Sequence, residues 1–153
     1  MSTKCTRITP QVWCANWYET APDRLLIEKE AMRKRFPGFE LVKMDDDNLV
    51  WLGTLTSNSN NQYEIAVIYP RNFPNSAPLV YPVNPRIEVW DEKSFRVRHQ
   101  YSDGHLCLYY PGDRTFHNNT TAAVVIGVAA AWFFAYEYWL DSGKREWPGP
   151  EAD

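Results

Sequence analysis

The chain has 153 residues, a length that fits one domain. Hydrophobic residues make up 44% of it and charged residues 23%, which is typical of a globular protein and excludes wholesale disorder. The 16 Lys and Arg residues against 19 Asp and Glu residues give a formal net charge of -3. That balance argues against a sequence-independent nucleic-acid binder, which needs an excess of cations to displace counterions.

The first predicted element is a helix that begins at Pro22. Proline suits the first position of a helix, and Asp23 in the first turn complements the helix dipole. Apolar residues recur at helical spacing as far as Phe36, where Pro37-Gly38 ends the pattern. The remaining positions predict a solvated and mostly basic face, made of Arg24, Glu28, Arg33, Lys34 and Arg35.

Three strand-like segments follow, at residues 39–44, 49–56 and 62–69. The turns between them are short, so the strands are expected to pair antiparallel as a meander. A proline-rich segment then precedes a fourth strand, which is placed between Leu79 and Val89. Pro82 and Pro85 have no backbone N–H to donate to a neighbouring strand, so this strand is predicted to lie at an edge of the sheet or to start late.

The stretch from Trp90 to Thr120 has no period, and irregular stretches of this length inside a domain are often functional. A final helix is predicted from about Thr121 to Leu140, apolar nearly all round and therefore buried across the sheet. Its candidate N-caps are Asn118, Asn119 and Thr120. The order of helix, meander, long loop and helix predicts an α+β fold.

The compartment is predicted from the cysteines and the apolar runs. Cys5, Cys14 and Cys107 form no C-x-x-C pair, which is poor material for a disulfide framework and suits a reducing compartment. The first fifteen residues contain no signal-peptide apolar block. The longest uncharged apolar run, residues 122–136, is shorter than the roughly twenty residues of a membrane span. We therefore expect a cytoplasmic protein with no membrane span.

The irregular stretch contains Cys107 and all the histidines, and three interpretations of this constellation compete. A cysteine on a loop beside histidines and a carboxylate is a candidate nucleophile, because the thiolate is strongly nucleophilic and forms acyl thioesters. Against this, a cysteine between two leucines is often a small buried hydrophobic residue without chemistry. A zinc site is the second interpretation, although the spacing of its ligands matches no standard module. Its ligands would be His99, His105, Cys107 and His117.

The third interpretation is a papain-like hydrolase, in which a cysteine is paired with a histidine. Such a cysteine usually sits at a helix N-terminus, where the dipole favours the thiolate. The predicted helix starts well after Cys107, which disfavours this interpretation.

The order of elements and several motifs together resemble the ubiquitin-conjugating (UBC-fold) enzymes. Phe73-Pro74-Asn75-Ser76-Ala77-Pro78 is similar to the proline-rich segment that follows the third strand in that family. His99-Gln100-Tyr101 stands where the family has its His-Pro-Asn signature. Asp103-Gly104-His105-Leu106-Cys107-Leu108 is similar to the turn and Cys-Leu of its active site. The resemblance covers residues 23–140 and implies a UBC-like fold for a single domain over residues 1–153, with a core at about 22–143.

The chain also departs from the eukaryotic pattern. The signature asparagine, which that family uses to stabilise the oxyanion, is replaced, and Tyr101, Asn118, Asn119 and backbone N–H groups remain as candidates. The chain stops soon after the last helix, and its ending resembles the bacterial branch found in antiphage operons of the CBASS type. Those operons signal through cyclic oligonucleotides.

The resemblance implies an acyltransferase that carries the C-terminal glycine of a protein modifier on Cys107 as a thioester and passes it to an amine. The modifier implied in the bacterial branch is the operon's nucleotide cyclase, with an activating enzyme and an acceptor protein as further partners. His99, Tyr101 and Asp103 would support the active-site loop, and Lys29 and Arg33 would contact the activating enzyme. No metal, cofactor, nucleic acid or membrane is implied. The alternative is a non-catalytic binding module of the same fold.

Overall fold

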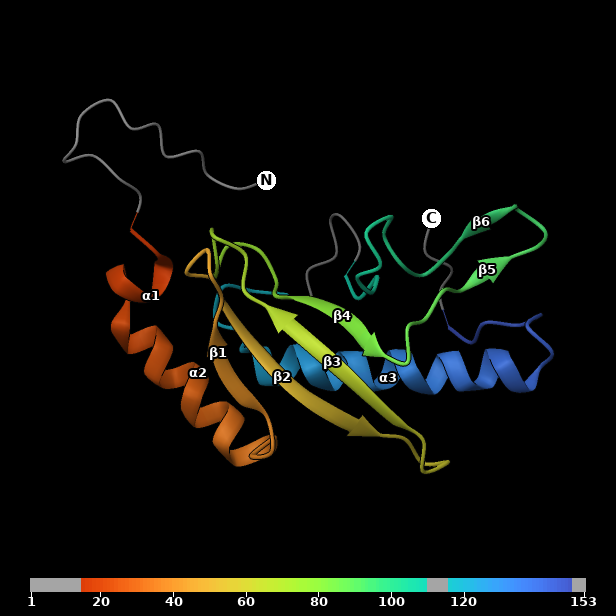
Figure 1. The fold of residues 1–153 in the computed structure, drawn as a ribbon, viewed down its shortest axis with the longest axis horizontal. Coiled ribbons are helices and arrows are strands. Elements are labelled where there is room, and N and C mark those ends of the chain that lie inside the picture. The colour runs from red at the N-terminus through yellow and green to blue at the C-terminus, as the bar shows by residue number, and fades with distance from the viewer. Residues whose placement is uncertain (1–14, 110–115, 150–153) are drawn as a thin grey trace.

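Four antiparallel strands form the central sheet of the computed structural model, which describes residues 15–109 and 116–149. They are β1 (Glu40–Lys43), β2 (Leu49–Thr56), β3 (Gln62–Ile68) and β4 (Leu79–Asn84), and they lie side by side in chain order. The long helix α3 (Ala122–Asp141) crosses behind the sheet, and α1 (Trp17–Thr20) and α2 (Pro22–Arg35) lie at one end of it (Figure 1). The predicted α+β meander is confirmed.

The core lies between the sheet and α3. Trp51 pairs with Val67 and Val67 pairs with Val80 across the three strands, and all three side chains are buried. On the other side of the core, Phe133 of α3 stacks on Tyr63 of β3 with ring centroids 4.4 Å apart. By length and composition α3 could cross a membrane, and 44% of its apolar window is buried within the fold; a single helix of this kind is weak evidence for a membrane span.

The helix α3 is less completely buried than its composition predicts. Nine of its residues are buried, among them Ile126 and Trp132, but Val124 and Phe134 are exposed on the opposite side. The N-cap is Thr121, whose hydroxyl accepts a hydrogen bond from the N–H of Val124. The predicted caps at residues 118–120 were therefore wrong by one position or more.

The predicted solvated face of α2 was wrong at Glu28, whose side chain is completely buried. One carboxylate oxygen accepts hydrogen bonds from the Tyr69 hydroxyl and from the N–H of Ala122, both at 2.8 Å. The Nε of Arg24 lies 3.2 Å from the other oxygen. The periodicity of the helix does not reveal this, because the two hydrogen-bond donors, Tyr69 just after β3 and Ala122 at the start of α3, are distant in sequence.

The proline-bearing strand β4 lies at an edge of the sheet, as its prolines predict. The irregular stretch, by contrast, contains a small hairpin of β5 (Trp90–Asp91) and β6 (Arg96–Val97). The sequence did not predict this hairpin, because the stretch shows no periodic pattern of apolar residues. Two residues per strand are too few for an alternation to be recognised in sequence. The segment that follows this hairpin carries the candidate site.

Candidate active site

A tight turn brings the two halves of the candidate active-site loop together just before Cys107. Gly104 in this turn has a φ of +96°, a left-handed conformation that glycine adopts without strain. The N–H of Gly104 donates to the carbonyl of Tyr101 at 2.9 Å, and the N–H of Tyr101 donates to the carbonyl of His105 at 2.9 Å. The turn therefore folds the residues after it back onto those before it.

The buried side chain of Gln100 ties this turn to the preceding segment. Its Oε1 accepts a hydrogen bond from the N–H of Val89 at 2.9 Å. Its Nε2 donates to the carbonyls of Ile87 at 2.9 Å and of Gly104 at 3.1 Å. Gln100 thus acts as a clamp inside the loop, a role that its place in the His-Gln-Tyr motif did not reveal.

Leu106 anchors the segment that carries Cys107. Its N–H donates to the carbonyl of Val80 in β4 at 2.9 Å, and its side chain is buried. His105 and Cys107, on either side of it, are partly exposed. Because successive side chains of an extended chain alternate in direction, His105 and Cys107 share the outward face.

His99 supports Cys107 through its backbone. Its φ of +64° is a left-handed conformation, and its carbonyl accepts the N–H of Cys107 at 3.0 Å and the indole Nε1–H of Trp132 at 2.9 Å. The imidazole is buried and stacks on Trp147, with centroids 4.0 Å apart and planes at 7°. These contacts fit a residue that shapes the loop.

The sulfur of Cys107 lies in a partly buried position beside Tyr101. Burial raises the pKa of the Cys107 thiol, because desolvation disfavours the thiolate, and a hydrogen bond with Tyr101 works in the opposite direction. The pKa of Tyr101 is raised, first by its own burial and then by the sulfur. The arrangement fits a tyrosine hydroxyl that donates to the thiolate. Cys107 is in no disulfide.

A chain of contacts extends from Cys107 through Tyr101 to the side chains of His105 and Asp103. The imidazole of His105 stacks on Tyr101 with centroids 4.2 Å apart and planes at 16°. Its Nδ1 lies 2.5 Å from Oδ1 of Asp103, and the hydroxyl of Tyr81 donates to Oδ2 of Asp103 at 2.7 Å. Burial and, after it, the hydrogen bond to the Asp103 carboxylate raise the pKa of Tyr81 to about 12. Hydrogen bonds from Tyr81 and His105 lower the pKa of Asp103, outweighing its desolvation.

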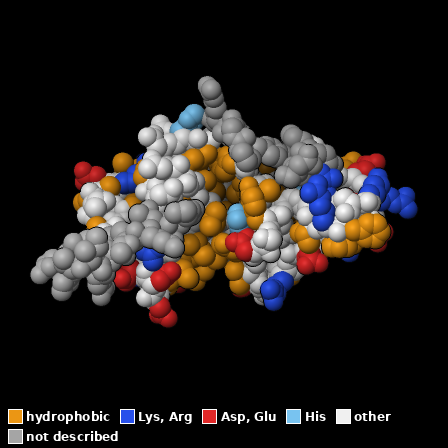
Figure 2. Space-filling view, turned by 90° about the horizontal axis from the view of Figure 1, so that it is seen from above, with side chains coloured by type: hydrophobic (Ala, Val, Ile, Leu, Met, Phe, Trp, Pro, Cys, Tyr) orange, Lys and Arg blue, Asp and Glu red, His pale blue; other side chains and the backbone are white. Residues whose placement is uncertain are grey.

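A groove runs beside this cluster along the edge of β4. It is lined by the proline-rich segment on one side and by the loop on the other: Ser76, Ala77, Pro78, Leu79, Tyr101, His105, Leu106, Leu108 and Tyr109. The upper face of the molecule has hydrophobic side chains gathered in its middle, between charged side chains at the two ends (Figure 2). The groove is therefore lined by an imidazole and phenol rings, and Cys107 lies beside it, between the lining residues Leu106 and Leu108.

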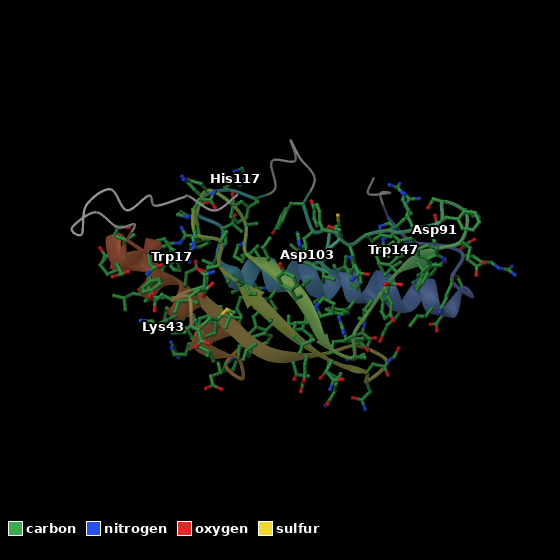
Figure 3. The ribbon with its side chains drawn as sticks, turned by 45° about the horizontal axis from the view of Figure 1, so that its top comes forward. Trp17, Lys43, Asp91, Asp103, His117 and Trp147 are labelled. Carbon is green, nitrogen blue, oxygen red and sulfur yellow. The ribbon has the colours of Figure 1, made fainter. Side chains whose placement is uncertain are left out.

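The other sequence candidates lie apart from this groove. His117 lies toward the α2 end, and Trp147, on which the sequence candidate His99 stacks, lies toward β5, with Asp103 between them (Figure 3). Lys29 and Arg33 are exposed on α2, where Glu30 pairs with Arg33 at 2.6 Å. Within residues 15–109 and 116–149, no group of three His, Cys, Asp or Glu side chains is placed to hold a metal ion.

Sequence reasoning missed two members of the cluster. His105 was named only as a possible zinc ligand, and Tyr81 was not considered. The spacing of His105 and Cys107, two residues apart, is the signal that places both on one face of an extended chain. Tyr81 gives no such signal, because it reaches Asp103 from β4 across 22 positions of sequence.

One comparison with known protein families found a match. A family model described as "Type II CBASS E2 protein" matches residues 28–153, which include the sheet, the loop with Cys107 and α3. No curated protein and no solved structure matches the chain.

Proposed function

The chain belongs to the Type II CBASS E2 protein family, and on that premise we propose that Cys107 carries an acyl group as a thioester and passes it to an amine. The observation that supports this most directly is the placement of Cys107, whose side chain is partly exposed on the loop next to the buried Leu106. A cysteine that only filled the core would occupy the position of Leu106, which is buried.

Two exchanges make up the proposed reaction. In the first, the Cys107 thiolate attacks the carbonyl carbon of the modifier's activated C-terminal glycine, the new C–S bond forms, and the donor's thiolate or other activating group leaves. In the second, an acceptor amine attacks the Cys107 thioester, the C–N bond forms and the C–S bond breaks. Covalent catalysis of this kind replaces one difficult amide-forming step with two easier ones.

Tyr101 is the side chain that we place at the reacting sulfur. Burial makes the thiolate of Cys107 scarcer than that of a free thiol, and a hydroxyl that donates to the sulfur offsets part of that effect. The same hydroxyl is the nearest candidate donor for the oxyanion of the tetrahedral intermediate, a type of contact worth about 10²–10³ in rate. Asn118 and Asn119 are exposed beyond the groove, and Arg24 bonds the Asn118 carbonyl at 2.5 Å.

The partners follow from the family and from the chemistry. We propose the nucleotide cyclase of a CBASS operon as the modifier, an activating enzyme as the source of its acyl group and an amine-bearing protein as the acceptor. A reactive thiol of this kind needs a reducing compartment, which is consistent with the cytoplasm.

The test is the intact mass of the protein co-expressed with the products of its operon, isolated without reductant. Wild type is expected to carry a protein-sized adduct that thiols remove. Cys107→Ser is expected to carry the same mass as an oxygen ester that thiols leave in place. Absence of an adduct from both forms, with partners still co-purifying, would favour the non-catalytic binding module instead.

The exposed cations of α2 are proposed as the docking site for the activating enzyme. Reversing both charges, with Lys29→Glu and Arg33→Glu, is expected to slow acyl transfer onto Cys107 at low ionic strength, because the attraction between the partners is lost. The effect should shrink as salt is added. Lys93→Glu, an exposed reversal on the β5–β6 hairpin, is the control. Equal transfer rates for the double variant and wild type would rule this docking site out.

A further inference from the structure

The side chain of His105 is held in one orientation beside Cys107. Oδ1 of Asp103 lies 2.5 Å from Nδ1 of His105, and the imidazole packs against the rings of Tyr101, at 4.2 Å between centroids, and Tyr81, at 5.6 Å. Asp103 is itself fixed by the Tyr81 hydroxyl at 2.7 Å and by the N–H of His105 at 3.1 Å. The proposed thioester chemistry at Cys107 does not by itself require such an arrangement.

The contact with Asp103 determines what the imidazole can do. A carboxylate accepts a hydrogen bond, so a neutral imidazole beside it carries its proton on Nδ1. Its Nε2 is then the unprotonated nitrogen and can accept a proton. Many enzymes use a carboxylate in this way to hold a histidine base in the required tautomer and orientation.

The imidazole of His105 lies where the acceptor amine would approach Cys107. His105 and Cys107 lie on the same outward face of the extended segment, with the buried Leu106 between them. Tyr101 relates to both: its ring stacks on the imidazole, and its hydroxyl acts to lower the pKa of the Cys107 thiol. Both Tyr101 and His105 also line the groove beside β4. Cys107 follows one lining residue, Leu106, and precedes another, Leu108, so an amine that reaches the thioester along this groove passes the imidazole.

We propose that His105, oriented by Asp103, is the base that accepts a proton from the acceptor amine during its attack on the Cys107 thioester. The neutral amine bonds to the carbonyl carbon, and its nitrogen becomes positively charged. The Nε2 of His105 takes one proton from that nitrogen, the C–S bond breaks and Cys107 leaves as the thiolate. The imidazolium then gives the proton to water. This proposal rests on the thioester function proposed above.

The two half-reactions separate the role of His105 from that of Cys107. The protein is first loaded with a synthetic peptide that ends in glycine and is activated as its mercaptoethanesulfonate thioester. The loaded protein is then freed of excess thioester and mixed with free lysine, and the amide product is measured by mass. Cys107→Ser, which keeps Cys5 and Cys14, gives the background from the other thiols.

His105→Gln is expected to load at the wild-type rate, because thiol exchange removes no proton from nitrogen, and to form the lysine amide about 10²-fold more slowly. Asp103→Asn should also slow amide formation while leaving loading unchanged. His117→Gln, an exposed histidine distant from the groove, is the matched control and should change neither step.

The possible failures are distinct. If wild type acquires no more acyl group than Cys107→Ser, the thioester function itself is wrong. If His105→Gln loads normally and forms the amide at the wild-type rate, the thioester stands and the base is refuted. If loading falls as much as amide formation, His105 has a structural role only, and the proposal is refuted as well.

Discussion

Glu28→Ala is expected to lower the free energy of unfolding by about 3–5 kcal/mol, the range found when one partner of a buried ion pair is removed. The carboxylate connects three elements, because it bonds the N–H of Ala122 at the start of α3 and the hydroxyl of Tyr69 after β3. Tyr69 in turn accepts the indole N–H of Trp51 at 2.8 Å. Without Glu28, Arg24 would lose its ion-pair partner, while keeping its bonds to the carbonyls of Asn118 and Thr120.

Chemical denaturation of Glu28→Ala, Glu28→Gln and Glu30→Ala tests this prediction. Glu28→Gln retains a hydrogen-bond acceptor for Tyr69 and Ala122 and should be destabilised less than the alanine variant. Glu30 is half exposed and pairs with Arg33 at the surface, so its replacement should have little effect. Similar losses for Glu28→Ala and Glu30→Ala would show that the buried network does not stabilise the fold.

The same network makes the free energy of unfolding depend on pH. Burial raises the pKa of Glu28, and the bonds from Ala122, Tyr69 and Arg24 only partly offset that effect. The folded protein therefore binds this proton more tightly than the unfolded chain does. The contribution of Glu28 to the stability of the fold is complete below the pKa that this carboxyl has in the unfolded chain. It is lost as the pH rises through the higher pKa that the carboxyl has in the folded protein. Glu28→Gln should lack this decline.

Trp132→Ala is the second substitution with a large expected effect, about 3–5 kcal/mol. The side chain is buried, and its ring contacts Phe133, Tyr136 and Trp147. Its indole N–H also bonds the carbonyl of His99, which accepts the N–H of Cys107 as well. We therefore expect a melting temperature lowered by roughly 10 °C, since about 2–4 °C accompany each kcal/mol in a protein of this size.

A comparison with Trp132→Phe and Trp90→Ala separates packing from the hydrogen bond. The phenylalanine variant keeps an aromatic ring and loses the N–H, so it should be destabilised by about 1 kcal/mol. Trp90 is 43% exposed on β5, and its replacement should change stability by less than about 0.5 kcal/mol. If Trp132→Ala melts like Trp90→Ala, α3 does not support the loop in the way described.

The sequence was sufficient for the elements whose patterns are local. The strand at 49–56 was predicted to the residue, and the N-terminal helix was predicted to begin at Pro22, because turn formers and prolines mark those boundaries. Residue spacing and family resemblance together singled out Cys107. The burial of Glu28 was not predictable, because its partners are distant in sequence and its own position in the helix is that of a surface residue.

The candidate site was predictable only in part for the same reason. Tyr101 and Asp103 were expected to support the loop, and the structure places both in the cluster beside Cys107. Tyr81 belongs to a strand, and the clamp formed by Gln100 depends on carbonyls at residues 87 and 104. Side-chain partners of this kind become visible only when the topology has brought the segments together.

The buried Leu106 has a consequence for how this loop tolerates change in length. Its side chain points into the core while those of its two neighbours point outward. Whether a side chain in this segment faces the core or the solvent therefore depends on whether it lies an odd or an even number of residues from Leu106. Deleting or inserting one residue between Gly104 and Cys107 would shift that parity and turn the thiol toward the core. A two-residue change would preserve it. Spacing, as much as residue type, is therefore what natural variation in this segment has to keep.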